Sequence, residues 1–397
     1  MKFRQYDLNM PNEPQILVIS FSDISVDSRV LREISVVEKH GHVTTLGYGP
    51  KPRYGHVHLQ VPDKDKSLPQ TIPGVLKLGL RLHKAAALAA PGNKAALRLL
   101  EGRTFDAVVA NDARSLPLAF EVARRNGAPV WGDMHEFAPE ERTHVTSWRM
   151  LVKPFMDWIC RTYLPECKAT TTVSNEFAKL YKAHYGIDPR IVMNASFFKD
   201  LEPSPMPEDG TIRLVHGGGA VYGRNIEGMI EAVKTIGNPL TLDLYLVPGG
   251  DGGAYLGKLK EIAGDDPRIR IHPPVKPQEL LATLNHYDVG IHWLPPYSAN
   301  AIYTLPNKIF EYVQARLAVA IGPTKEMVNL VDKYHFGLVS NGFTQQDILD
   351  TLRELNVENV REFKTAAHAA ARDLSYETSA QVIDEVMEAL LLGKAAK

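Results

Sequence analysis

The sequence has few cysteines, no long apolar run and no marked excess of charge. Its only cysteines, Cys160 and Cys167, fit neither a C-x-x-C motif nor a zinc-binding spacing, and two free thiols are typical of a reducing compartment. No run of 18 apolar residues and no signal peptide is present, so we expect a cytoplasmic protein that does not span a membrane. The formal net charge of -1 gives no reason to expect nucleic acid as a partner, so any electrostatic attraction requires a local patch.

The sequence does contain a repeated alternation of short apolar runs and helical patterns. Residues 16–20 form an apolar run typical of a strand buried on both faces, and 27–40 repeat apolar residues at helical spacing. Repeated strand-then-helix units predict parallel sheets. Further strands are expected at 42–47, 107–110, 129–132, 170–173, 190–193, 212–216, 242–247, 269–271, 289–293, 317–321 and 337–339. Further helices are expected at 116–126, 226–236, 277–285, 306–315, 325–332, 345–355 and 376–392.

The length and one change of composition predict two domains. A chain of 397 residues exceeds what a single hydrophobic core usually supports, and residues 202–210 are rich in proline and charge, as in a linker. We therefore expect two doubly wound α/β domains that face each other across a cleft. The expected bounds are residues 1–200, a linker at 201–210, and residues 211–375, with a helix at 376–397 that crosses back to pack on the first domain.

The segment from Leu305 to Tyr312 gives the strongest local signal for a ligand site. Pro306 fits the first position of a helix, where free backbone N–H groups and the helix dipole favour a phosphate. Lys308 adds a charge in the first turn, and Glu311 follows on the same face at i,i+3 spacing. Such a site would suit a nucleotide. The helix start would bind its diphosphate, and the carboxylate one turn further on would accept hydrogen bonds from the ribose hydroxyls. The alternative is an ordinary surface ion pair.

Residues 217–224 place three glycines and Arg224 directly after an expected strand. Glycines at a strand-to-helix turn let a ligand approach the backbone, so Gly217 and Gly218 are candidates for phosphate contact. Arg224 could clamp the phosphate near the start of the next helix. The spacing is not that of a dinucleotide-binding motif, and the alternative is a tight turn that requires glycine.

One histidine and one acidic pair are further candidates for a functional site. His135, in the segment 133–136, would project from a strand end, where it could hydrogen-bond a sugar hydroxyl or an acceptor, although a single histidine is more often structural. Asp63 and Asp65 form a D-x-D pattern. They lie in a polar loop far from any glycine turn, so we favour a solvated loop and expect no metal site.

Two stretches combine basic residues with apolar or aromatic ones. Residues 77–103 carry six Lys or Arg against Glu101, with leucines between them, and residues 148–168 mix basic and aromatic side chains. A basic amphipathic face can rest on an anionic membrane surface, here the inner face of the plasma membrane. The interpretation we favour is an ordinary amphipathic helix that covers the sheet.

The order and spacing of these pieces resemble the family-4-like retaining glycosyltransferases of the GT-B type, over most of the chain. The matching motifs are Asp27-x-Arg29-Val30-x-Arg32, Asn111-Asp112, Asp133-x-His135-Glu136, the segment 217–224, and Pro306-Asn307-Lys308-x-Phe310-Glu311-Tyr312. The resemblance implies that Arg224 and Lys308 bind the donor diphosphate near Gly217 and Gly218. It further implies that Glu311 binds the ribose, that the backbone at Val275 contacts the base, and that His135 lies near the reacting sugar. Asp27, Arg29 and Asp112 would lie on the acceptor side.

The implied activity is transfer of a hexose-like sugar from a nucleotide-diphosphate donor, with UDP or GDP favoured. Retention of configuration, no metal and no cofactor are implied, and the acceptor would be a glycan, a lipid-linked molecule or a small molecule, as in cell-envelope polysaccharide synthesis. The chain departs from the family at Tyr303, where a second glutamate is common, and at Arg316 and Ala318, where Gly and Pro are usual. Two alternatives stay open, a sugar-nucleotide epimerase of the same fold and a non-catalytic nucleotide-binding partner subunit.

Overall fold

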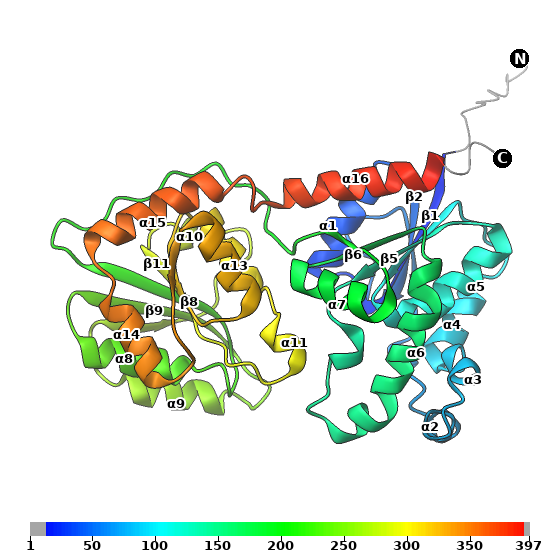
Figure 1. Ribbon diagram of the computed structural model, residues 1–397, viewed down its shortest axis with the longest axis horizontal. Coiled ribbons are helices and arrows are strands. Elements are labelled where there is room, and N and C mark those ends of the chain that lie inside the picture. The colour runs from blue at the N-terminus through cyan, green and yellow to red at the C-terminus, as the bar shows by residue number, and fades with distance from the viewer. Residues whose placement is uncertain (1–12, 393–397) are drawn as a thin grey trace, which may run out of the picture. The chain divides into compact units, whose positions relative to one another are not determined.

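The computed structural model describes residues 13–392, which form two compact α/β units (Figure 1). Unit 1 is the chain up to Val192 together with the residues from Ala380 on, and unit 2 is Met193–Ser379. Residues 192–211 contain no helix or strand, and this stretch includes the proline-rich segment 202–210. No helix in the described part of the chain combines the length and the apolar character that a bilayer span needs.

Unit 1 is built on a seven-stranded parallel sheet with the order β3-β2-β1-β4-β5-β6-β7. The strands are β1 (Gln15–Asp23), β2 (His42–Tyr48), β3 (Val57–Gln60), β4 (Ala107–Asn111), β5 (Val130–Met134), β6 (Ala169–Thr172) and β7 (Arg190–Ile191). The helices are α1 (Ser28–Val37), α2 (Ile72–Gly79), α3 (His83–Ala87), α4 (Pro91–Leu99), α5 (Leu116–Asn126), α6 (Lys153–Tyr163) and α7 (Asn175–Tyr185). Short helical turns are η1 (Ala113–Ser115), η2 (Ala138–Glu140), η3 (Trp148–Val152) and η4 (Leu164–Glu166).

The last helix, α16 (Tyr376–Leu392), returns the chain to unit 1. Asp384 of this helix accepts a hydrogen bond from Nε2 of His40 at 2.8 Å, and Glu385 pairs with Arg190. Two polar contacts therefore hold α16 against unit 1 from residue 380 on.

Unit 2 is built on a six-stranded parallel sheet with the order β10-β9-β8-β11-β12-β13. The strands are β8 (Ile212–Ala220), β9 (Leu240–Pro248), β10 (Ile269–His272), β11 (Val289–His292), β12 (Ala318–Ile321) and β13 (Gly337–Val339). The helices are α8 (Ile226–Ile236), α9 (Ala254–Ala263), α10 (Leu280–Leu284), α11 (Ala299–Ile302), α12 (Asn307–Gln314), α13 (Lys325–Tyr334), α14 (Gln345–Arg353) and α15 (Val357–Ala370).

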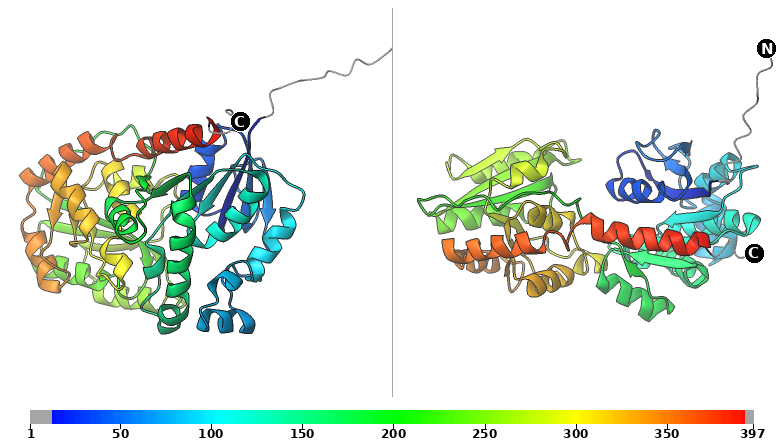
Figure 2. Two further views of the ribbon diagram at one scale, coloured as in Figure 1. Left: turned by 45° about the vertical axis from the view of Figure 1, so that its right-hand side comes forward. Right: turned by 90° about the horizontal axis from the view of Figure 1, so that it is seen from above.

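Helices cover both faces of the unit 2 sheet (Figure 2). Successive strand residues point to opposite faces, so Leu214 packs in the core formed with α8, α9 and α14, whereas Val215 packs in the core formed with α12, α13 and α15. Burial on both faces explains why the strands of this sheet read as continuous apolar runs.

The strand order of each sheet reverses beside its first strand, between β1 and β4 in unit 1 and between β8 and β11 in unit 2. Loops leave the carboxyl ends of two such strands in opposite directions, which opens a crevice for a ligand. The predicted fold class of two doubly wound α/β domains is confirmed, and these two switch points direct attention to the residues around them.

Two details differ from the sequence-based expectation. Gly217–Gly219 were expected to form a turn, but they continue β8 by pairing with residues 245–247 of β9. The chain turns only at 221–225, where Asn225 takes a left-handed φ of 55° before α8. Pro306 was expected as the first residue of α12, but it is the N-cap, with extended backbone angles. Gly217–Gly219 are in a strand because β9 pairs with them, and no local sequence pattern reveals that pairing.

Candidate functional site

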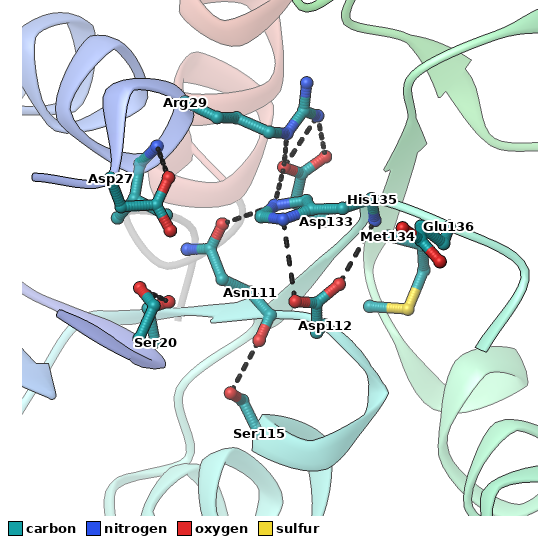
Figure 3. A network of polar contacts seen from close by, with 12 residues as sticks. Ser20, Asp27, Arg29, Asn111, Asp112, Ser115, Asp133, Met134, His135 and Glu136 are labelled. Atoms are coloured by element: carbon teal, nitrogen blue, oxygen red, sulfur yellow. Dashed lines mark hydrogen bonds and ion pairs between the residues drawn. The ribbon is translucent and has the colours of Figure 1, made fainter. Parts of the chain in front are cut away.

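A buried network of charged side chains lies at the carboxyl ends of β4, β5 and β6 (Figure 3). Its centre is Asp133 of β5, which is only 1% exposed. Arg29 of α1 donates to both carboxylate oxygens, with Nη2–Oδ distances of 2.8 Å, and Thr171 donates to Oδ1 at 2.5 Å. Burial would raise the pKa of Asp133, but the Arg29 charge and the bonds from His135 and Thr171 hold this pKa well below its usual range. Asp133 is therefore a fixed negative charge.

Arg29 and Asp27 both make polar contacts within unit 1. The third guanidinium nitrogen of Arg29, Nη1, donates to the carbonyl of Val192 at 2.9 Å. Asp27 is the N-cap of α1 and accepts a bond from the backbone N–H of Val30 at 3.3 Å. These contacts show what holds each side chain in place, and the expected position of both residues on the acceptor side stays a prediction.

His135 is held by acceptors on both sides of its ring. Nε2 lies 3.0 Å from Oδ1 of Asn111 and 3.0 Å from Oδ2 of Asp133, and Nδ1 lies 3.5 Å from Oδ2 of Asp112. Burial would lower the pKa of His135, but the carboxylates of Asp112 and Asp133 raise it above the ordinary value. Acceptor oxygens therefore face both ring nitrogens, which favours the protonated form of the imidazole.

Asp112, directly after β4, has a strained backbone. Its φ of 63° with ψ of 157° belongs to a region that residues other than glycine rarely adopt, and such strain persists mainly at functional sites. One carboxylate oxygen accepts from the backbone N–H of His135 at 3.3 Å. Asp112 and His135 also line a pocket of about 160 Å³ together with Arg114, Glu136 and Glu141. A small polar group, such as a sugar hydroxyl, would fit here.

Glu33 is a member of this network that sequence analysis missed. It lies on α1 one turn after Arg29, is 3% exposed, and accepts a bond from Nδ2 of Asn111 at 2.8 Å. That bond fixes the Asn111 amide so that its oxygen faces His135. Burial, and then the charge of Asp133, raise the pKa of Glu33 to about 8. The i,i+4 spacing from Arg29 on an otherwise apolar face was the available signal.

Replacing Glu33 by glutamine is expected to stabilise unit 1 increasingly as the pH rises from 5 to 8. Folded Glu33 keeps its proton up to about pH 8, whereas the unfolded chain loses it near 4.5, so wild-type stability falls across this window. Glutamine cannot ionise, and the difference should grow by about 1.4 kcal/mol per pH unit. Urea unfolding at several pH values measures it. Exposed Glu358, changed to glutamine, is the control, and a constant difference for Glu33→Gln would contradict the shifted pKa.

Unit 2 brings three of the predicted phosphate-binding residues together at the carboxyl end of β8. A Cβ added to Gly218 would lie 2.7 Å from Nζ of Lys308 and 3.7 Å from Nη1 of Arg224. The φ of 142° at Gly218 is a second reason why only glycine suits this position. Burial lowers the pKa of Lys308, the nearby carboxylate of Glu311 opposes this shift, and Arg224 adds to it. Two cations and a bare backbone therefore share one small region.

Helix α12 packs close to the sheet, and its first turn, which carries Lys308, lies beside Gly218. Gly290 of β11 allows the approach, because a Cβ there would lie 2.3 Å from the Tyr312 ring. The Tyr312 hydroxyl donates to the carbonyl of Ile291 at 3.2 Å. The N-cap residue, Pro306, has no side-chain hydrogen bond to the first backbone N–H groups of the helix. These groups and the positive end of the helix favour an anion.

Two buried histidines at the β8–β11 switch point were also missed. His216 and His292 stack with ring centroids 5.7 Å apart and planes 9° apart, and Nδ1–H of His216 donates to the carbonyl of Ile291 at 2.8 Å. Within the described residues, neither ring nitrogen of His292 has a hydrogen-bond partner. Burial, and then Lys308, lower the pKa of His216 to about 3, and burial, His216 and Lys308 lower that of His292. Both rings are neutral, so they add no charge to the cationic region.

The remaining predicted positions lie farther from this cluster. Val275 lies in the loop after β10, which is two strands removed from β8 at the same edge of the sheet. Tyr303, in the place of the common second glutamate, has its ring under the ammonium group of Lys325 at 4.8 Å. Among residues 13–392, no group of three or more His, Cys, Asp or Glu is placed to hold a metal ion.

The two sheets and their strand order match the fold of GT-B glycosyltransferases. Sucrose-phosphate synthase from Thermosynechococcus elongatus is similar with 13% identity and a TM-score of 0.67, over 96% of this chain and 100% of that chain. A glycosyltransferase from Rickettsia africae is similar with 11% identity and a TM-score of 0.66, over 96% and 99%. HepE from Anabaena, solved with UDP and glucose, is similar with 12% identity and a TM-score of 0.63, over 94% and 99%.

The first unit also carries a sequence match to a family. Residues 42–194 match the family model described as Glycosyltransferase Family 4, a region that includes Asp112, Asp133 and His135. No curated protein sequence matches the chain. The expected likeness to family-4-like proteins of the GT-B type is confirmed for the fold and for this region.

Proposed function

We propose that the chain is a glycosyltransferase that moves a sugar from a nucleotide-diphosphate donor, a UDP or GDP sugar, onto an acceptor hydroxyl. The observation that carries the proposal is the pair of cations, Lys308 and Arg224, beside the bare backbone of Gly218. Solved proteins with this fold support it, since the HepE structure holds UDP and glucose and one from E. coli holds UDP-2-fluoro glucose.

A diphosphate suits this cluster for electrostatic reasons. Lys308 and Arg224 repel each other in a partly buried setting, where Glu311 supplies one negative charge near Lys308 and the two neutral histidines supply none. An anion would relieve the repulsion and would accept bonds from both side chains and from the start of α12. Glu311, one turn further along α12, would then accept hydrogen bonds from the ribose hydroxyls.

The same groups would lower the barrier of transfer. As the bond between the anomeric carbon and the diphosphate oxygen breaks, negative charge grows on the leaving group, and Lys308 and Arg224 stabilise it. The acceptor oxygen bonds to the anomeric carbon, and its proton passes to the leaving phosphate, with configuration retained. His135, whose raised pKa favours the protonated form, is not the base in this scheme. Its Nδ1, which lies 3.5 Å from Oδ2 of Asp112, would donate a hydrogen bond that orients the acceptor hydroxyl.

Nucleotide diphosphates are expected to stabilise unit 2 markedly. At a concentration 100 times the Kd, binding contributes about 2.7 kcal/mol, which for a unit of this size corresponds to a rise in Tm of roughly 5–10 °C. A thermal-shift panel with UDP, GDP and ADP measures the effect. The matched controls are uridine and guanosine, which lack the diphosphate and should shift Tm by far less.

The ribose assignment of Glu311 can be separated from the diphosphate assignment. In Glu311→Ala, UDP should lose its advantage over 2′-deoxy-UDP, whereas the gain from the diphosphate should persist. Transfer of sugar to an acceptor, with no epimer formed when the acceptor is left out, completes the test. Absence of any shift with all three nucleotides would refute the proposal.

A further inference from the structure

One part of the surface of unit 1 exposes an unusual number of large apolar side chains. Helix α2, the turn after it and η3 carry them, and α2 and α3 project from one end of unit 1 (Figures 1 and 2). We call them the α2–η3 patch, with exposed fractions of 80% for Ile72, 60% for Leu76, 70% for Leu80, 51% for Leu82 and 61% for Met150.

The α2–η3 patch is continuous and is not a helix face that covers the sheet. Ile72, Leu76 and Leu80 follow one another at a spacing of four residues, so they form one stripe along α2. Arg81 donates to the carbonyl of Met150 at 3.0 Å, which holds η3 beside the end of α2. Leu78 is the most buried apolar side chain of α2, and it lies on the side of the helix opposite the stripe. An apolar stripe turned to the outside needs an occupant.

The charge around the α2–η3 patch identifies the kind of occupant. Segments 71–85 and 142–153 contain six Lys or Arg residues and no Asp or Glu, although the whole chain has a net charge of -1. Lys153 is paired with Glu140, while Arg81, Lys84 and Arg149 are exposed. Exposed apolar side chains with basic residues in the same segments match the surface of an anionic bilayer, which has an apolar interior beneath negative headgroups.

A cavity lies on the inner side of this region and shares two lining residues with the pocket at His135. About 480 Å³ in volume, it is lined by Val75 and Leu78 of α2 and by Trp148, Leu151 and Val152 of the η3 turn. Arg114 and Glu141 line this cavity and also the smaller pocket at Asp112 and His135. A molecule with an apolar end in the large cavity could place its polar end beside Arg114 and Glu141, at the border of the polar pocket.

We propose that the α2–η3 patch docks unit 1 on an anionic membrane and that the acceptor is an amphiphile drawn from that membrane. The apolar part of the acceptor lies in the cavity at Trp148 and Leu151, and its hydroxyl lies in the pocket at His135. The proposal of membrane docking depends only on the α2–η3 patch, whereas the proposal of an amphiphilic acceptor also rests on the proposed transferase function.

Sedimentation with vesicles tests the docking. The protein should pellet with vesicles of 30% phosphatidylglycerol in phosphatidylcholine, much less with phosphatidylcholine alone, and less at high salt. Lys84→Glu with Arg149→Glu should lower the partition coefficient more than about twentyfold, because each basic residue near such a surface contributes about fivefold. Leu76→Ser with Leu80→Ser should lower it about tenfold or more.

Matched controls keep the test specific. Lys260→Glu with Arg361→Glu reverses two exposed charges in unit 2, and Val26→Ser removes an apolar side chain that is 75% exposed elsewhere in unit 1. Both should bind vesicles as the wild type does. Wild-type protein that stays in the supernatant, or controls that lose as much binding as the patch variants, would overturn the docking. A patch variant that instead turns a dimer into a monomer would show a protein interface.

The acceptor is tested separately from the donor site. Labelled sugar from the donor should enter the organic phase of a membrane-lipid extract, and the patch variants should lower this transfer on vesicles while leaving the thermal shift with UDP or GDP unchanged. Label that enters only water-soluble acceptors would overturn the amphiphile. Failure of the nucleotide shift with vesicle binding intact would remove the transferase function and leave the docking standing.

Discussion

Replacing Lys308 by alanine is expected to slow sugar transfer by about 10²–10³-fold in kcat, equivalent to about 2.7–4 kcal/mol of transition-state stabilisation. The ammonium group lies beside the Gly218 backbone, where we place the diphosphate, and it is needed most when the leaving group is most negative. Arg224→Ala should have a comparable effect. Because both cations face one diphosphate, the double variant should lose less than the product of the two single effects.

Steady-state kinetics with saturating acceptor distinguishes this role from simple binding. A contact made only in the transition state lowers kcat and kcat/KM together, whereas a uniform binding contact raises KM alone. Gly218→Ala offers an independent approach, since its Cβ would meet Nζ of Lys308 at 2.7 Å and displace it. Lys333→Ala, an exposed lysine on α13 of the same unit, is the control and should change kcat less than twofold. A wild-type kcat in Lys308→Ala would disprove the assignment.

The fold could be predicted from the sequence because it depends on local patterns. Buried parallel strands read as short apolar runs, and helices with clear ends, such as α5 with Gly127 after it and α8, appear at the expected residues. The Gly217–Gly219 run was placed in a turn because glycine usually marks turns. Its strand conformation comes from pairing with residues 245–247, a partner that lies outside any local window.

The sequence predicted the residues of the candidate site that lie in short, local motifs, and it missed those whose neighbours are distant in the sequence. Lys308 and Glu311 lie one turn apart in a sequence-local motif, and the structure places their charges within mutual influence. Glu33 and His292 were missed because their environments are made by distant residues. Glu33 is buried against Asn111, 78 positions away, and His292 against His216 on the neighbouring strand of the sheet. Which strand neighbours which is a property of the topology rather than of either segment.

Replacing Arg29 by methionine is expected to destabilise unit 1 by about 3–5 kcal/mol, because it leaves the Asp133 carboxylate buried without its main counter-charge. The pair is 8% and 1% exposed, so water cannot take over the role of the guanidinium. Three of the four tryptophans, Trp131, Trp148 and Trp158, lie in unit 1, so urea unfolding followed by tryptophan fluorescence reports mainly on it. Arg125→Met breaks an exposed pair with Glu121 and should change the stability by less than about 1 kcal/mol.

The pH dependence decides whether charge or packing causes the loss in Arg29→Met. In the wild type the depressed pKa of Asp133 contributes stability above its ordinary value of 3.8, and this is lost as the pH falls. Without Arg29 the pKa of Asp133 rises, so the carboxylate can take up a proton in mildly acidic solution and the deficit should shrink there. Loss of packing alone would give the same deficit at every pH. Adding Asp133→Asn to Arg29→Met removes the stranded charge and should recover part of the stability at neutral pH, an outcome that a purely steric effect does not allow.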